Sequence, residues 1–149
     1  AALGRVQLAG RFEIVPGAVE WILDIAHNEP AARVLARHLN ERPLPSPAAA
    51  GRGRTFAVAG MLADKDAAGI AAALAPCIDH WILCALPGPR GGSAAALAGR
   101  MQLTAPRSTL ADSVAEGCVR ARALARPGDR VVVLGSFYTV GPAREWLRI

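Results

Sequence analysis

The chain has 149 residues, 52% of them hydrophobic and 19% charged, a composition that supports one domain with a sizeable core and excludes a disordered chain. Its apolar runs are much shorter than a membrane span, so we expect no transmembrane helix and no membrane partner. The net charge of +5 comes from scattered arginines and the single lysine, Lys65, without the basic stripe and aromatic platforms that nucleic-acid binding requires. This charge favours anionic small molecules as ligands.

The three cysteines, Cys77, Cys84 and Cys118, have no C-x-x-C spacing. Their odd number and spacing exclude a disulfide framework and a zinc site, and indicate a reducing compartment. Residues 1–5 lack the features of a secretion signal, so we expect a cytoplasmic protein. The chain does not begin with Met, and we expect it to be part of a longer polypeptide.

The predicted elements begin with extended segments at 12–15 and 19–23, which the Pro-Gly turn signal at 16–17 joins into a hairpin. The second segment contains a buried strand at 21–23. A helix follows from about Asn28, which is a good N-cap residue ahead of a proline in the first helical turn.

Three polar residues, Asp24, His27 and Asn28, crowd the turn between this strand and this helix. The free N–H groups and positive dipole end of a helix N-terminus attract anions, and open α/β sheets bind ligands at the carboxyl ends of their strands. The alternative interpretation is that Asp24 only caps the turn and that His27 is an ordinary loop histidine. Both interpretations stay open at this point.

The middle of the chain contains a loop and two further strands. Three prolines and two glycines in residues 40–53 predict a long surface loop. A buried strand at 55–60 precedes a helix from Asp66, as the N-cap, to Leu74, and another buried strand covers 80–85.

Residues 87–93 form a glycine-rich loop around Arg90, ahead of a helix at 94–98. Such a loop can hold phosphate. It matches neither G-x-x-x-x-G-K-[ST] nor G-x-G-x-x-G, so a tight turn is the favoured interpretation.

The last third of the chain predicts a short strand at 101–104, a helix that opens at the box Thr109-x-x-Asp112, and a buried strand at 130–135. A terminal helix follows residues 136–140, with Pro142 near its start. The residues expected to bury the first of these helices are Leu110, Val114, Cys118 and Ala121.

Strands that alternate with helices predict a Rossmann-like three-layer α/β sandwich. We expect a mostly parallel sheet of about six strands, with an N-terminal antiparallel hairpin and helices on both faces. The carboxyl ends of parallel strands share one edge, and the polar residues expected there are Asp24, His27, Asp64, Lys65, Arg90 and Ser136. They predict an anion or nucleotide pocket without identifying a reaction.

Five segments occur in a characteristic order: GRF (10–12), DIAHN (24–28), GMLADKD (60–66), GPRG (88–91) and GSFYTV (135–140). Together they resemble the C-terminal domain of the bacterial bifunctional dihydrofolate synthases/folylpolyglutamate synthases, which are relatives of the Mur ligases. The resemblance covers nearly the whole chain. It assigns residues 11–149 to a Mur-ligase-type C-terminal domain and residues 1–10 to a linker from an N-terminal ATPase domain.

Members of this family use ATP and Mg²⁺ to form an acyl phosphate on a folate or pteroate carboxylate. The amine of L-glutamate then attacks, giving an amide, ADP and phosphate. In the family the N-terminal domain supplies the phosphate-binding loop and the metal ligands. The resemblance therefore implies that this chain holds no metal of its own, does not catalyse alone, and belongs to a monomeric ligase with ATP, L-glutamate and dihydropteroate or folate as substrates.

The resemblance also implies roles for individual residues. Arg11 is expected to reach a phosphate of ATP, and Asp24 and Asn28 to belong to the nucleotide site, with Asp24 accepting from ribose hydroxyls. His27 and Ser136 are expected near the incoming glutamate or the nucleotide, as neutral donors to carboxylate oxygens, and we assign them to the glutamate site.

Lys65 and Arg90 match positions of the family that contact substrate or phosphate. Two other functions share the same architecture: the C-terminal domain of a Mur ligase for peptidoglycan precursors, and a free-standing nucleotide-binding module. The GSFYTV segment favours the folate branch.

Overall fold

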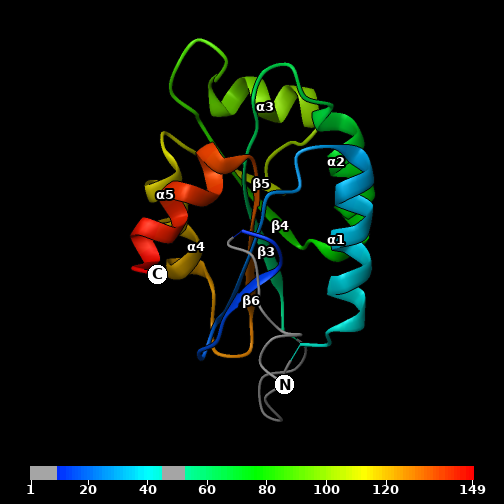
Figure 1. Ribbon diagram of the computed structural model, residues 1–149, viewed down its shortest axis with the longest axis vertical. Helices are drawn as coiled ribbons and strands as arrows, with labels where there is room; N and C mark the ends of the chain where they lie inside the picture. The colour runs from blue at the N-terminus through cyan, green and yellow to red at the C-terminus, as the bar shows by residue number, and fades with distance from the viewer. Residues whose placement is uncertain (1–9, 45–52) are drawn as a thin grey trace.

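The computed structural model describes residues 10–44 and 53–149. Strands and helices alternate along most of the chain (Figure 1). The elements are β1 (Glu13–Val15), β2 (Glu20–Asp24), α1 (Glu29–Glu41), β3 (Thr55–Gly60), α2 (Ala67–Leu74), the short 3-10 helix η2 (Ala75–Cys77), β4 (His80–Cys84), α3 (Ala94–Met101), β5 (Ser108–Ala111), α4 (Val114–Leu124), β6 (Arg130–Gly135) and α5 (Phe137–Leu147). None of the helices in the described ranges has the length and apolar character of a membrane span.

The strands form one six-stranded sheet in the order β1-β2-β6-β3-β4-β5. β1 and β2 form the predicted antiparallel hairpin, and every other neighbouring pair is parallel. Helices α1, α2 and α3 cover one face, and α4 and α5 cover the other (Figure 1). The predicted three-layer sandwich is confirmed.

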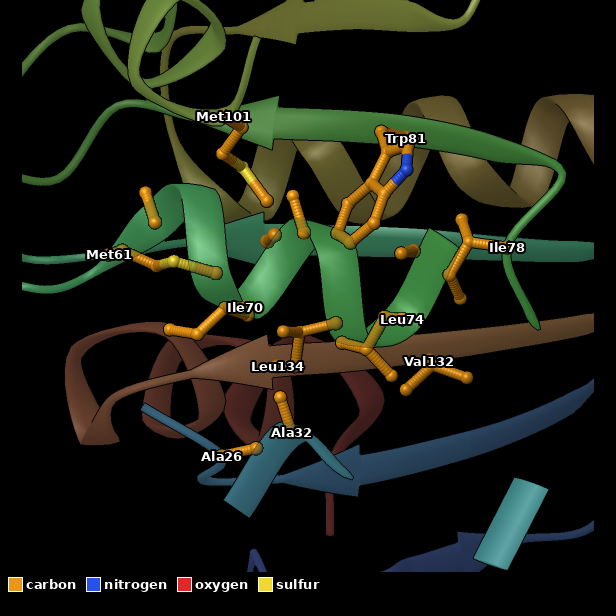
Figure 2. Packing of buried hydrophobic residues seen from close by; sticks show 14 of the residues in the cluster. Ala26, Ala32, Met61, Ile70, Leu74, Ile78, Trp81, Met101, Val132 and Leu134 are labelled. Carbon is orange, nitrogen blue, oxygen red and sulfur yellow. The ribbon is translucent and has the colours of Figure 1, made fainter. Parts of the chain in front are cut away.

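The central strands are buried on both faces. In β6, Val132 and Leu134 pack into the core beneath α1, α2 and α3 (Figure 2), whereas Val131 and Val133 pack beneath α4 and α5. Strands covered on both sides are apolar in their interiors, as β3 and β6 are after their first residues, Thr55 and Arg130. Polar chemistry is therefore confined to the ends of the strands.

Two of the predicted helix starts are confirmed. The Asn28 Oδ1 accepts a hydrogen bond from the N–H of Ala31 at 2.8 Å and caps α1. The Asp66 Oδ1 accepts from the N–H of Gly69 at 3.0 Å and caps α2.

The segment between α3 and α4 differs from the prediction. Helix α3 continues beyond residue 98 to Met101, and Gln102 ends it in the left-handed conformation with φ 59°, so the strand predicted at 101–104 is wrong. The strand is β5, at the outer edge of the sheet. Only Ala111 of β5 is buried, and a strand with one buried residue leaves little hydrophobic pattern in the sequence.

The helix start predicted at Thr109 is also wrong. Ser113 caps α4, because its Oγ accepts from the N–H of Glu116 at 3.1 Å. Thr109 and Leu110 lie in β5, where the side chain of Leu110 is 44% exposed instead of buried. The other residues predicted to bury this helix do so: Val114, Cys118 and Ala121.

Smaller differences concern the ends of elements. Helix α5 starts directly after Ser136, so Pro142 lies inside the helix rather than near its start. Helix α1 runs to Glu41 and shortens the loop predicted at 40–53. Residues 45–52 of that loop and residues 1–9 of the predicted linker lie outside the described residues.

Candidate functional site

The carboxyl ends of β2, β6 and β3 lie next to one another at one edge of the sheet, which we call the carboxyl edge. Leu134 of β6 is paired with Asp24 of β2, and Gly135 of β6 with Gly60 of β3. The segments that leave these strands are therefore neighbours, although they are far apart in the sequence.

These segments and the loop at 87–93 line a pocket of about 270 Å³. Four of the predicted site residues meet in this pocket, each from a different segment: His27, Lys65, Arg90 and Ser136. The remaining lining residues are Ile25, Leu62, Phe137 and Tyr138. We call this the polar pocket.

The ring of His27 is oriented by its own turn. Its Nδ1 lies 2.9 Å from the carbonyl oxygen of Ile25. A carbonyl oxygen only accepts, so Nδ1 carries the proton and the neutral ring offers Nε2 as an acceptor. We expected His27 to act as a neutral donor to a carboxylate. With Nδ1 bonded to Ile25, the neutral ring cannot donate through Nε2, and only the imidazolium can.

Ser136 is the N-cap of α5 and directly follows β6. Its Oγ accepts from the N–H of Tyr138 at 3.1 Å, which leaves the hydroxyl proton to be donated to a ligand. The hydroxyl of Thr139 donates to the carbonyl oxygen of Gly60 at 2.6 Å. This bond ties the start of α5 to the end of β3 and fixes the position of Ser136.

Two cationic side chains come from adjacent loops. The N–H of Ala63 donates to the carbonyl oxygen of Arg90 at 2.8 Å and joins the loop of Lys65 to the loop of Arg90. The guanidinium of Arg90 also pairs with the exposed carboxylate of Asp64 at 3.0 Å. Asp64 itself does not line the polar pocket.

The glycine-rich loop around Arg90 is a tight turn, as predicted. Leu86 and Gly92 exchange two backbone hydrogen bonds, at 3.1 and 3.2 Å. Ser93 then caps α3 by accepting from the N–H of Ala96 at 3.0 Å.

Three residues of this edge were not among the predicted site residues, although two of them lie in the GSFYTV segment. The Nη2 of Arg100 donates to the carbonyl oxygens of Leu62 and Lys65 at 3.0 and 2.9 Å and holds the Lys65 loop in place; no local pattern marks this role. Phe137 and Tyr138 line the polar pocket and are 68% and 59% exposed. Their position directly after an N-cap at the end of a strand is the signal that could have identified them.

A mostly apolar groove of about 480 Å³ adjoins the polar pocket and shares Phe137 and Tyr138 with it. Pro87, Val114 and Pro142 also line the groove. A charged pocket beside an apolar groove suits a ligand that has both a charged part and an apolar part.

The residues predicted to bind ATP lie outside the polar pocket. Asn28 caps α1. The carboxylate of Asp24 accepts from the N–H of Phe12 at 3.1 Å and from the N–H of Ala26, so it does hold the turn, and its role toward a nucleotide stays a prediction. Arg11 is exposed and lies near enough for its charge to act on Asp24.

Burial raises the pKa of Asp24 above its ordinary value of 3.8, although its two backbone hydrogen bonds and the charges of His38 and Arg11 act in the opposite direction. With a raised pKa, the folded state holds this proton more tightly than the unfolded state does. The resulting stabilisation is present below pH 3.8 and is lost as the pH rises through the folded-state pKa.

We therefore expect the stability difference between Asp24→Asn and wild type to shift in favour of the variant as the pH rises from roughly 3 to 7. Asp64 is the control, because its hydrogen bond with Arg90 lowers its pKa, so Asp64→Asn is expected to shift in the opposite direction. Urea denaturation across this pH range measures both differences. The same sign for the two variants would contradict the assignment.

Within residues 10–44 and 53–149, no group of three or more His, Cys, Asp or Glu side chains is placed to hold a metal ion. The donors of the polar pocket are two cations, an imidazole and a hydroxyl, whereas Mg²⁺ is bound by carboxylates and other oxygen ligands. The donors of the polar pocket therefore fit an anion rather than Mg²⁺.

The chain matches the family described as "Mur ligase, glutamate ligase domain" over residues 10–137. The dihydrofolate synthase/folylpolyglutamate synthase of Escherichia coli K12 is 39% identical over 93% of this chain. The chain spans only 30% of the length of that relative.

Two solved structures are similar in fold and sequence. Escherichia coli FolC in complex with DHPP and ADP has a TM-score of 0.83 and 38% identity, covering 95% of this chain and 31% of that one. A bifunctional folylpolyglutamate synthase/dihydrofolate synthase with Mn, AMPPNP and L-glutamate bound also has a TM-score of 0.83 and 38% identity, covering 96% and 32%. The resemblance inferred from the five segments is confirmed, and because the family match covers most of its residues, the chain belongs to the glutamate ligase domain family of the Mur ligases.

Proposed function

We propose that the chain is the C-terminal domain of an ATP-dependent ligase that adds L-glutamate to dihydropteroate or folate through an acyl phosphate. In this proposal residues 11–149 form the domain, and a preceding linker joins it to a larger domain. The names of the relatives support the proposal, and so does the small share of their length that this chain spans. The relatives' names favour folate ligases over ligases of peptidoglycan precursors.

The observation that carries the proposal is the convergence of His27, Lys65, Arg90 and Ser136 in the polar pocket. Glutamate is a dianion with one ammonium group, and two cations with two neutral hydrogen-bonding groups suit it. Lys65 and Arg90 would neutralise its carboxylates, and the hydroxyl of Ser136 would donate to one of them.

The tautomer of His27 suggests a more specific role. The neutral ring can accept a hydrogen bond at Nε2 from the amino group of glutamate, and this would orient the nitrogen that attacks the acyl phosphate. The apolar groove beside the pocket would take the aromatic part of the acyl substrate and keep water away from the reacting carbon.

In the same proposal Arg11 contacts a phosphate of ATP and Asp24 a ribose hydroxyl, both outside the polar pocket. In this proposal the preceding domain would supply the ligands of Mg²⁺. The three cysteines are free thiols, which supports a reducing compartment such as the cytoplasm for this ligase. In the same proposal the ligase is a monomer.

The test is an assay of the full-length parent protein. We expect ADP release that requires both L-glutamate and dihydropteroate or folate, and a His27→Ala variant whose kcat/KM for glutamate is lower by roughly tenfold or more, the effect of one hydrogen bond to a charged group. His80→Ala is the matched control. His80 is the first residue of β4, at the amino ends of the strands and opposite the carboxyl edge, where it bonds Thr109. ADP release without glutamate or an acyl substrate would reject the proposed function.

A further inference from the structure

Residues 10–12, which we call the N-terminal arm, have an unusual backbone. Gly10 has φ +75° and Phe12 has φ +46°. A non-glycine residue in the left-handed region is strained, and such residues persist only where their surroundings over-determine them, often at functional positions. Arg11 lies between the two, with its side chain exposed.

Three hydrogen bonds hold the arm in place. The N–H of Ile25 donates to the carbonyl oxygen of Gly10 at 2.6 Å, and the N–H of Phe12 donates to Asp24 at 3.1 Å. The N–H of Gly10 donates to the Oε1 of Glu13 at 3.2 Å. The backbone on both sides of Arg11 is therefore fixed, while its side chain extends into solvent.

The arm also fits closely against the carboxyl edge. A Cβ at position 10 would lie 3.1 Å from atoms of Ile25 and Val140, so the backbone of Gly10 is in close contact with the turn after β2 and with α5. The ring of Phe12 packs against His38 of α1, edge to face, with the ring centroids 5.2 Å apart.

The carboxylate of Glu13 is itself held by Arg144 of α5. Burial tends to raise the pKa of Glu13, but the hydrogen bond from Arg144, the hydrogen bond from Gly10 and the charge of Arg144 outweigh it and lower the pKa. The acceptor for Gly10 is therefore ionised at neutral pH. Ser136 caps α5, and Phe137 and Tyr138 of this helix line the polar pocket, so this contact connects the arm to the helix at the pocket.

We propose that Glu13 is a positioning residue: it accepts from the N–H of Gly10 while bound to Arg144, and thereby sets where Arg11 meets its anionic ligand. This inference rests on the proposed function, in which the ligand is a phosphate of ATP. A long arginine side chain on a fixed backbone loses less freedom on binding than one on a mobile segment, so its contact contributes more to affinity.

The simpler account is that Glu13 and Arg144 form an ion pair that only stabilises the fold. The two accounts separate when the pair is reversed. In the double variant Glu13→Arg with Arg144→Glu, the ion pair can re-form, but arginine has no acceptor for the N–H of Gly10. The simpler account predicts that the reversal restores every property of the wild type.

The experiment uses the full-length protein, with the dissociation constant for ATP from calorimetry and the KM values for ATP and glutamate from the ligase assay. We expect Glu13→Ala to weaken ATP binding roughly tenfold, which corresponds to about 1.4 kcal/mol, and to leave the KM for glutamate unchanged. Glu13→Gln keeps an acceptor oxygen and should recover most of the affinity. The reversed pair should recover the melting temperature and not the ATP affinity.

Arg11→Ala is the positive control, and Glu29→Ala, which breaks an exposed ion pair on α1, is the negative control. Recovery of ATP affinity together with the melting temperature in the reversed pair would overturn the inference, as would unchanged ATP affinity in Glu13→Ala. Absence of glutamate ligation in the wild type would reject the proposed function instead, because the ATP dissociation constant is measured without ligation.

Discussion

Replacing Gly135 with alanine is expected to destabilise the chain by more than about 4 kcal/mol, which places it among the most damaging single substitutions. Gly135 has φ +134°, which side-chain-bearing residues rarely adopt, and a Cβ there would lie 2.0 Å from the carbonyl oxygen of Gly60. Gly60 is its partner in the β3–β6 pairing. The backbone atom cannot move aside without opening the centre of the sheet.

Gly141→Ala is the matched control, six residues further along the chain. A Cβ at Gly141 would meet no atom within 4 Å, and alanine is the better helix former, so this variant should gain about 0.5–1 kcal/mol. Urea denaturation monitored by circular dichroism measures both. A Gly135→Ala chain with the midpoint of the wild type would show that the turn after β6 relaxes far more easily than its geometry implies.

Much of the fold was predictable from the sequence, because its central strands have a clear pattern. The strands at 21–23, 55–60, 80–84 and 130–135 are short apolar runs, because each is buried on both faces. Three of them end at a polar or glycine residue, where the chain leaves the core: Asp24, Gly60 and Gly135. Once such strands are parallel, the polar residues after them must meet at one edge. The convergence of His27, Lys65, Arg90 and Ser136 follows from this rule.

The region around β5 could not be predicted in the same way. An edge strand with one buried residue has no period-two pattern. Thr109 and Ser113 both begin plausible capping boxes, and only the tertiary contacts of β5 with β4 decide that Ser113 is the cap. Thr109 bonds His80 of the neighbouring strand at 2.7 Å, and this long-range contact leaves no local signal.

Among the residues predicted to bind ATP, Asn28 and Asp24 have structural roles. The sequence alone could not decide between these roles and ligand binding. Asn28 caps α1, and Asp24 holds the N-terminal arm. The strained backbone of Phe12 is equally invisible in the sequence, because it arises from contacts with residues 12 and 26 positions further along the chain. Local pattern therefore predicts which residues gather, and tertiary contacts decide how their backbones are held.

Ser136→Asp is expected to raise the KM for glutamate roughly 100-fold or more in the full-length protein while leaving stability nearly unchanged. Aspartate is as good an N-cap as serine and its charge suits a helix N-terminus, so the bond from the N–H of Tyr138, 3.1 Å in the wild type, can be retained. The same carboxylate would stand in the polar pocket beside a carboxylate of glutamate. Two like charges about 4 Å apart repel by roughly 4 kcal/mol at an effective dielectric constant of 20.

Ser136→Ala should have a larger effect on stability and a smaller effect on KM. Loss of the cap lowers the unfolding free energy by about 1 kcal/mol. Loss of one hydrogen bond raises the KM for glutamate by only about tenfold. Ser93→Ala uncaps α3, and Ser93 does not itself line the polar pocket, so this variant should match that loss of stability without any change in KM. Steady-state kinetics and thermal denaturation of the three variants measure both quantities. A wild-type KM for glutamate in Ser136→Asp would show that Ser136 is not in the glutamate site, because a carboxylate in that site would repel the carboxylates of glutamate.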